Sequence, residues 1–134
     1  MKTLDELILP HDLRYTRDHE WARVEGDLVR VGITDYAQDQ LGDVVYVELP
    51  EAGQTFARGE AFGTVESVKA VSELYLPVGG EIVEVNTGLS DAPQLVNEKP
   101  YDRGWMVVVR PSDPAEIGGL LDVEAYREHL RGIE

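Results

Sequence analysis

The stretch VESVKAVSEL, residues 65–74, reads almost the same in both directions about a centre between Lys69 and Ala70. Alternating apolar and polar residues on either side of a short connection are typical of a β-hairpin, in which like residues face one another. Folding the chain at this centre places Glu66 opposite Glu73. The sequence therefore predicts a two-stranded hairpin with Lys69 at its tip.

This predicted tip lacks the residues that favour two-residue hairpin turns. Such turns need positive φ angles and favour Asn-Gly, Asp-Gly or a glycine, whereas Lys69 and Ala70 supply neither. Glu66 opposite Glu73 also sets like charges across the strands, which is mildly unfavourable. We infer that something other than turn energetics favours a lysine here. The small neighbours Ser67 and Ala70 leave room for an enzyme to reach it.

Composition limits the chemistry that the chain can carry. Its 134 residues predict one domain that buries a sizeable core without a disulfide or a metal. Because there is no cysteine, thiol catalysis, iron–sulfur ligation and cysteine-type zinc sites are excluded. The formal net charge of −14, from 12 basic and 26 acidic side chains, disfavours nucleic acid and anionic membranes and favours basic patches on protein partners.

The first residues do not read as a targeting segment. MKTLDELILPHD, residues 1–12, mixes acidic residues into a short apolar run, unlike a signal peptide or an Arg-rich transit peptide. No apolar run approaches the length of a membrane helix. We therefore expect a cytoplasmic protein with no membrane partner.

Alternation and turn signals predict further strands and two helices. The strands cover residues 19–24, 27–33, 44–47, 81–85 and 105–109, with a long connection at 86–102. Thr34 and Gly42 cap a short internal helix. A second helix follows Asp122, with Val123, Tyr126 and Leu130 on one face that we expect to pack onto the β body.

A repeated motif suggests how the strands are arranged. GDVVYV at residues 42–47 returns as GEIVEV at 80–85, on either side of the Lys69 hairpin. We predict a mainly β fold, a flattened β-barrel or sandwich of two similar halves with a short internal helix and a C-terminal helix. The predicted domain spans 1–134, with an N-terminal extension at 1–12, a β body at 13–110 and a C-terminal helical segment at 111–134.

Catalytic signatures are weak. His11, His19 and His129 are scattered and lack the spacing of a helical metal site, and the chain has no nucleophile elbow, GxGxxG or Walker sequence. A nucleophilic lysine needs desolvation or nearby cations, whereas Glu66 and Glu73 flank this one. We therefore expect a protein that is not an enzyme, with the tip lysine as an acceptor of covalent modification.

Several segments together resemble the glycine cleavage system H-protein family, from about residue 13 to residue 130. They are YT at 15–16, HEW at 19–21, VGITDYAQ at 31–38, LGDVVYVELPEAG at 41–53, GTVESVKAVSEL at 63–74, GEIVEVN at 80–86, QLVN at 94–97, PYDRGW at 100–105 and LLDVEAYREHL at 120–130. Each motif alone is modest, but their order and combined coverage make the resemblance highly specific.

The resemblance implies a fold like that of lipoyl and biotinyl carriers, with lipoate attached as N6-lipoyllysine at Lys69. ESVKA aligns with the attachment motif of that family, so Glu66, Ser67, Val68 and Ala70 surround the modified residue. The lipoyl group then forms a swinging arm on a rigid post.

The resemblance also implies partner enzymes. A pyridoxal-phosphate glycine decarboxylase (P protein) loads an aminomethyl group onto the arm, and a tetrahydrofolate-dependent aminomethyltransferase (T protein) removes it. An FAD-containing dihydrolipoyl dehydrogenase (L protein) reoxidises the dithiol, and a lipoyl or octanoyl transferase or ligase attaches the arm. In this scheme of glycine catabolism and one-carbon metabolism the chain is a carrier.

Acidic residues near the hairpin are candidates to hold the amine of a loaded arm away from water. Glu20 belongs to HEW and Glu73 lies four residues from Lys69, and Asp18 is a third candidate. The same residues equally suit an ordinary solvated acidic surface, because accidental acidic pairs are common among 26 acids.

Other carriers and other classes of protein remain as alternatives. Biotin carriers have Met on both sides of the modified lysine, where this chain has Val68 and Ala70. Lipoyl domains of 2-oxoacid dehydrogenases are usually shorter and linked flexibly to a larger enzyme. The sequence does not distinguish a carrier of the glycine cleavage system from an H-like protein that relays lipoyl groups to other enzymes. An unmodified β-sandwich interaction module is the alternative from a different class.

Overall fold

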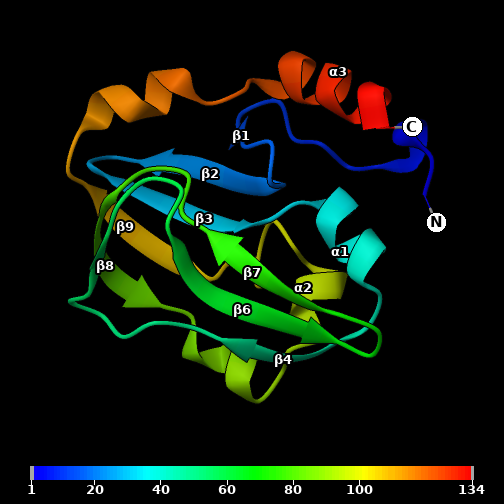
Figure 1. Cartoon of the computed structure of the whole chain (residues 1–134), viewed down its shortest axis with the longest axis horizontal. Coiled ribbons are helices and arrows are strands. Elements are labelled where there is room, and N and C mark those ends of the chain that lie inside the picture. The colour runs from blue at the N-terminus through cyan, green and yellow to red at the C-terminus, as the bar shows by residue number, and fades with distance from the viewer. Residues whose placement is uncertain (1, 134) are drawn as a thin grey trace.

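The computed structural model describes residues 2–133 as a flattened sandwich of two β-sheets with short helices around them (Figure 1). The larger sheet has six strands in the order β1-β2-β3-β9-β8-β5, and the smaller has three in the order β4-β6-β7. Within these residues the two sheets remain separate and do not close on each other. The mainly β prediction is confirmed, and of its two forms the sandwich is the one found.

The bounds of the elements are as follows. The strands are β1 (Arg14–Tyr15), β2 (Glu20–Glu25), β3 (Leu28–Ile33), β4 (Val44–Glu48), β5 (Thr55–Phe56), β6 (Ala61–Ser67), β7 (Val71–Tyr75), β8 (Gly80–Val85) and β9 (Val107–Pro111). The helices are α1 (Asp35–Leu41), α2 (Leu95–Glu98) and α3 (Val123–Ile133), with 3₁₀ turns η1 (Leu4–Glu6), η2 (Thr87–Ser90) and η3 (Pro114–Gly119).

The first hairpin and the internal helix form as predicted. Strands β2 and β3 pair antiparallel, and β3 continues directly into α1. The Thr34 side chain accepts a hydrogen bond from Ala37 N at 3.2 Å, which caps the helix N-terminus. Gly42 ends the helix with φ 74°, a left-handed value that glycine adopts without steric cost. This local chemistry fixes where α1 begins and ends.

The main core lies between the two sheets. Alternate residues of β6 and β7 point inward, so Val65 and Leu74 are each 1% exposed and pack with the buried valines of β3 and β9. The base of the Lys69 hairpin is therefore part of the core. The repeated motif contributes β4 to one sheet and β8 to the other, so each copy supplies a strand to a different layer.

A second apolar cluster holds the two ends of the chain against the larger sheet. The Tyr126 ring of α3 stacks on Tyr15 of β1 with ring centroids 4.6 Å apart, and Leu7 and Leu130 are buried in the same cluster. The apolar stripe of α3 therefore packs onto the β body, as predicted. The Asp122 side chain caps this helix by accepting from Ala125 N at 2.8 Å.

The register of the β6–β7 hairpin differs from the prediction by two residues. Glu66 pairs with Val71, and Glu73 pairs with Thr64. The two glutamates do not face each other, so the predicted like-charge pair across the strands is wrong. An even shift keeps every side chain on its expected face, because side chains alternate with a period of two.

A serine, rather than a positive φ angle, closes the hairpin turn. Ser67 N donates to Ala70 O at 2.8 Å, so Val68 and Lys69 form the tip, and not Lys69 and Ala70. The Ser67 hydroxyl accepts from the backbone N–H groups of Lys69, at 3.3 Å, and Ala70, at 3.1 Å. Val68 N also donates to Asp43 O at 3.0 Å, which ties the tip to the loop before β4. Side-chain closure of this kind removes the need for glycine or asparagine.

Other differences concern the connections. The long connection after β8 contains η2 and α2, and the strand predicted from residue 105 begins at Val107. The short strands β1 and β5 and the turns η1 and η3 were not predicted, because segments of two to six residues are too short to show a clear periodic pattern. The division at residues 12 and 110 remains a prediction.

Candidate functional site

The tip lysine lies exposed at the turn between β6 and β7, and Figure 1 shows that this turn lies on the same side of the molecule as α1. A Cβ placed on Gly42 would lie 3.5 Å from Lys69 Cε, so the aliphatic part of the lysine lies over the glycine that ends α1. The preceding residue, Leu41, lines a cleft that α1 helps to form.

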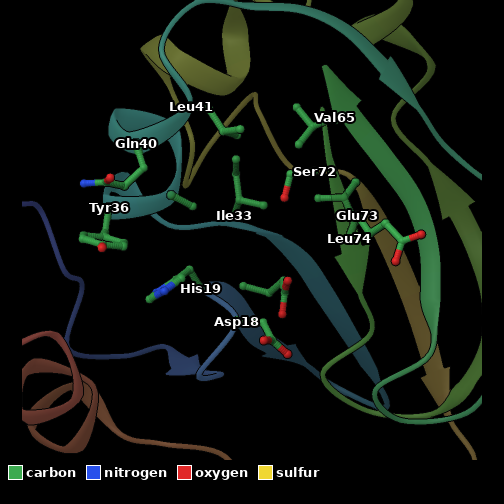
Figure 2. Close-up of a pocket in the computed structure, with 12 residues that line it drawn as sticks. Asp18, His19, Ile33, Tyr36, Gln40, Leu41, Val65, Ser72, Glu73 and Leu74 are labelled. Carbon is green, nitrogen blue, oxygen red and sulfur yellow. The ribbon is translucent and has the colours of Figure 1, made fainter. Parts of the chain in front are cut away.

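This cleft, of about 290 Å³, lies between α1 and the edge of the hairpin (Figure 2). Its volume is near the lower end of the roughly 300–1,000 Å³ found for small-molecule sites. One wall comes from α1 and the other from β6 and β7, as Figure 2 shows. Its apolar lining consists of Ile33, Tyr36, Ala37, Leu41, Val65 and Leu74.

Acidic side chains line the same cleft. Asp18, Glu20 and Glu73 all belong to its lining, together with Gln40 and Ser72. The Glu73 carboxylate is exposed and accepts a hydrogen bond from the Tyr75 hydroxyl at 3.1 Å. Asp18 is also exposed. The three acids proposed from the sequence are therefore gathered around one cleft, although β2 and β7 belong to different sheets.

Glu20 is the most unusual of these acids because its side chain is buried. It is 2% exposed, and its carboxylate accepts from the Thr16 hydroxyl at 2.7 Å and from Tyr75 N at 3.4 Å. None of the ion pairs among residues 2–133 includes Glu20. Burial, with a smaller contribution from the charge of Asp18, raises the pKa of Glu20 to about 7. A buried carboxyl group without a basic partner favours the approach of a cation.

His19 lies next to Glu20 and also lines the cleft, with its ring against aromatic neighbours. Its backbone has φ 73°, the one positive value at a non-glycine residue in the described chain. Its Nδ1 lies 2.9 Å from the Tyr126 hydroxyl, and its ring centroid lies 4.5 Å from that of Tyr36 and 5.6 Å from that of His129. Burial, helped by the charge of His129, lowers the pKa of His19 to about 4.

The structure corrects one expectation about the histidines. His19 and His129 were expected to be scattered, yet α3 brings their rings together. His19 lies directly before β2 and is half-buried. The packing of the C-terminal helix across β1 is a long-range contact, so the local sequence carries little signal for it. The adjacency of His19 to Glu20 in HEW was the available hint that His19 lines the same cleft.

Sequence reasoning also missed the α1 wall of the cleft. Tyr36, Ala37 and Leu41 were placed on a short helix without a role, and their side chains line the cleft. Ala37 and Leu41 are four residues apart and so lie on one face of α1, which is the signal that could have found that wall.

The part of the chain that the structure describes has neither a metal-binding cluster nor a membrane-spanning helix. No group of three or more His, Asp or Glu side chains within residues 2–133 is placed to hold a metal ion. None of the helices in that part of the chain is long and apolar enough to cross a membrane.

Comparison with known sequences gives one consistent family. The family model described as glycine cleavage H-protein matches residues 13–133. A glycine cleavage system H protein of Anaeromyxobacter sp. (strain K) is 59% identical over 126 residues, which cover 94% of this chain and 98% of the relative. One from Geobacillus kaustophilus (strain HTA426) is 61% identical over 117 residues, covering 87% and 92%.

A solved structure supports the same relationship. The crystal structure of a glycine cleavage system H protein from Mycobacterium marinum superposes with a TM-score of 0.83 at 44% sequence identity. The match covers 92% of this chain and 99% of that one. The sandwich and its surrounding helices are thus shared with an experimentally determined fold.

Proposed function

The chain belongs to the glycine cleavage H-protein family, and from this membership we propose that it carries lipoate in amide linkage on Lys69. Glycine cleavage H proteins are carrier proteins. The observation that best supports the attachment is the exposed Lys69 at a turn that Ser67 closes and Asp43 anchors. A stiff turn with an accessible amine suits acylation by another enzyme.

The cleft beside α1 fits the lipoyl group. Its apolar lining suits a hydrocarbon chain, and the Lys69 side chain lies against Gly42, the residue after the cleft-lining Leu41. When attached, lipoate supplies a dithiolane whose disulfide accepts an aminomethyl group and two electrons. This chain would then pass the aminomethyl group from glycine decarboxylase to the tetrahydrofolate-dependent aminomethyltransferase, and the dithiol to dihydrolipoyl dehydrogenase. A cytoplasmic location remains a prediction from the sequence.

We assign the acidic residues of the cleft the role of holding the ammonium of the bound aminomethyl group away from water. Glu20 offers a carboxylate held by Thr16 and Tyr75 in an apolar surrounding, where attraction to a cation is stronger than in water. Glu73 and Asp18 add negative charge at the mouth of the cleft. The neutral ring of His19 lines the same end without adding a repelling positive charge.

Peptide mass spectrometry tests the attachment. Protein made in cells supplied with lipoate and a lipoate ligase should gain one lipoyl mass on the peptide that contains Lys69. Lys69→Arg should gain none, because arginine keeps the charge and cannot be acylated in this way. An unmodified chain under these conditions would favour the unmodified interaction module instead.

The lifetime of the loaded arm tests the shelter. Glu20→Gln keeps the shape of the side chain and removes the charge, so the loaded form should release ammonia to water at least several-fold faster. Glu84→Gln, at an exposed carboxylate on β8, is the matched control and should leave the lifetime unchanged. Equal lifetimes for Glu20→Gln and the unsubstituted protein would remove Glu20 from the shelter.

A further inference from the structure

An apolar area of the outer face of the smaller sheet adjoins the hairpin tip. Val45, Tyr46, Val68 and Val71 are 50%, 53%, 70% and 66% exposed, and we call these four residues the tip patch. They are a majority of the large apolar side chains that are exposed among residues 2–133. A cluster of this kind on an otherwise acidic surface is typical of a protein interaction site.

The strand register explains why these side chains share one face. Tyr46 on β4 pairs with Glu66 on β6, and Glu66 pairs with Val71 on β7, so the three side chains form one row across the outer face. The register shifts between Val44 and Tyr46, and this bulge leaves both Val45 and Tyr46 exposed. Regular alternation would have buried one of the two, and bulges of this kind often redirect side chains at functional sites.

Acidic side chains lie within and around the tip patch, because Glu66 occupies the row between Tyr46 and Val71. Glu48 and Glu73 lie on either side of Thr64 in the next row of the sheet, and the exposed Asp43 precedes β4. The net charge of −14 adds to this local field. A second copy of the chain would bring acids against acids, so these acids favour a partner that presents cationic side chains together with apolar ones.

The position of Lys69 indicates which partner enzyme would contact the tip patch. An enzyme acting on the far end of the attached arm reaches its target at a distance from the tip. An enzyme that forms the amide must bring its acyl donor to the lysine Nζ itself, and so must cover the residues on either side. Val68 directly precedes Lys69, and Val71 lies two residues after Lys69. The patch therefore suits the acylating enzyme.

We propose that the tip patch is the docking surface for the enzyme that acylates Lys69, through apolar side chains of that enzyme together with basic ones. This inference rests on the proposed attachment of lipoate. In the step it serves, the uncharged Lys69 Nζ attacks the carboxyl carbon of an acyl adenylate. The amide bond forms, AMP departs with the bonding electron pair, and the nitrogen loses one proton to solvent.

The rate at which the unmodified protein gains lipoyl mass tests the proposal. The reaction contains a lipoate–protein ligase, ATP and lipoate. Tyr46→Thr/Val71→Thr removes apolar surface and keeps residues that favour strands. We expect its kcat/KM for modification to fall about tenfold or more, as for loss of central contacts in other interfaces. The rate for the unsubstituted chain should fall as ionic strength rises.

Matched controls separate docking from folding and from the attachment itself. Ile8→Thr/Val24→Thr changes two other exposed apolar residues, 62% and 51% exposed, and should be modified at the unsubstituted rate. In a Lys69→Arg background, which cannot react, the Kd for the ligase should weaken with the patch substitutions. Thermal unfolding should be the same for both double variants.

Two results would overturn the proposal in different ways. If the unsubstituted chain gains lipoyl mass and the patch variant gains it as fast with an unchanged Kd, the docking surface is wrong and the proposed function stands. If the unsubstituted chain gains no lipoyl mass, both fail.

Discussion

His19 and Glu20 are adjacent in the sequence, and burial shifts their pKa values in opposite directions. The pKa of His19 falls to about 4 and that of Glu20 rises to about 7, because each side chain loses solvent and the charged form of each is disfavoured. Both therefore favour the neutral form at mildly acidic pH, in a cleft otherwise bordered by exposed carboxylates.

This pair predicts compensating effects of pH on stability. Between about pH 4.5 and 6.5 the unfolded chain binds a proton at His19 and the folded chain binds one at Glu20, so the two contributions cancel. In Glu20→Gln only the histidine contribution remains. The free energy of unfolding should then rise with pH across this window, relative to the unsubstituted protein, by an amount on the order of 2–3 kcal/mol.

His19→Asn should show the opposite slope. Asparagine tolerates the left-handed backbone at this position and does not titrate. The glutamate contribution then remains, so the free energy of unfolding should fall as pH rises from about 4.5 to 7. Urea unfolding at several pH values measures both variants. Parallel pH profiles for the two variants would show that the opposed shifts are not present.

Ser67→Ala tests how the hairpin turn is closed. The hydroxyl is buried and accepts from the backbone N–H groups of Lys69 and Ala70. Its removal should lower the free energy of unfolding by about 1 kcal/mol and slow the modification of Lys69. Ser72→Ala, at an exposed position on β7, is the control for stability and should change it by less than about 0.5 kcal/mol. Equal changes in the free energy of unfolding for Ser67→Ala and Ser72→Ala would mean that Ser67 does not stabilise the turn.

Lys69→Arg separates the role of the lysine from the stability of its turn. The side chain is exposed, so the free energy of unfolding should change by less than about 0.5 kcal/mol while all lipoylation is lost. Denaturant unfolding and intact mass measure the two effects on one preparation. A large loss of stability would show instead that the Lys69 side chain stabilises the fold.

Local patterns were sufficient to predict several elements from the sequence. Thr34 and Gly42 bound α1 because capping depends on the residues at each helix end. The β2–β3 hairpin and the buried stripe of α3 follow from periods of two and 3.6 residues. These features are decided within a few residues of the chain.

Features that depend on contacts between distant segments were not predictable in the same way. The hairpin turn lies one residue earlier than the sequence predicted. The Ser67 side chain closes it with hydrogen bonds that the mirror symmetry of the sequence does not reveal. Burial of Glu20 requires β7, whose Tyr75 N reaches its carboxylate across 55 residues of sequence. The three candidate acids line one cleft, and their role there remains a prediction; only the fold shows that one of them is buried.

A last prediction concerns the packing of Trp21 against β3. Gly32 lies directly opposite Trp21 in the register, and a Cβ added to it would lie 2.7 Å from the indole ring. The ring is fully buried, and its Nε1 donates to Pro100 O at 2.9 Å, so it cannot move aside without losing that bond. Gly32→Ala should therefore lower the free energy of unfolding by about 1–3 kcal/mol.

Two further variants determine whether the clash is the cause. Gly118→Ala adds the same atom where nothing lies within 4 Å, and should leave stability unchanged or slightly raised. Trp21→Phe in the Gly32→Ala protein shortens the ring, so the two substitutions together should cost less than the sum of their separate effects. Strict additivity in denaturant unfolding would show that the glycine is not required by the indole, and that some other property of β3 explains the loss.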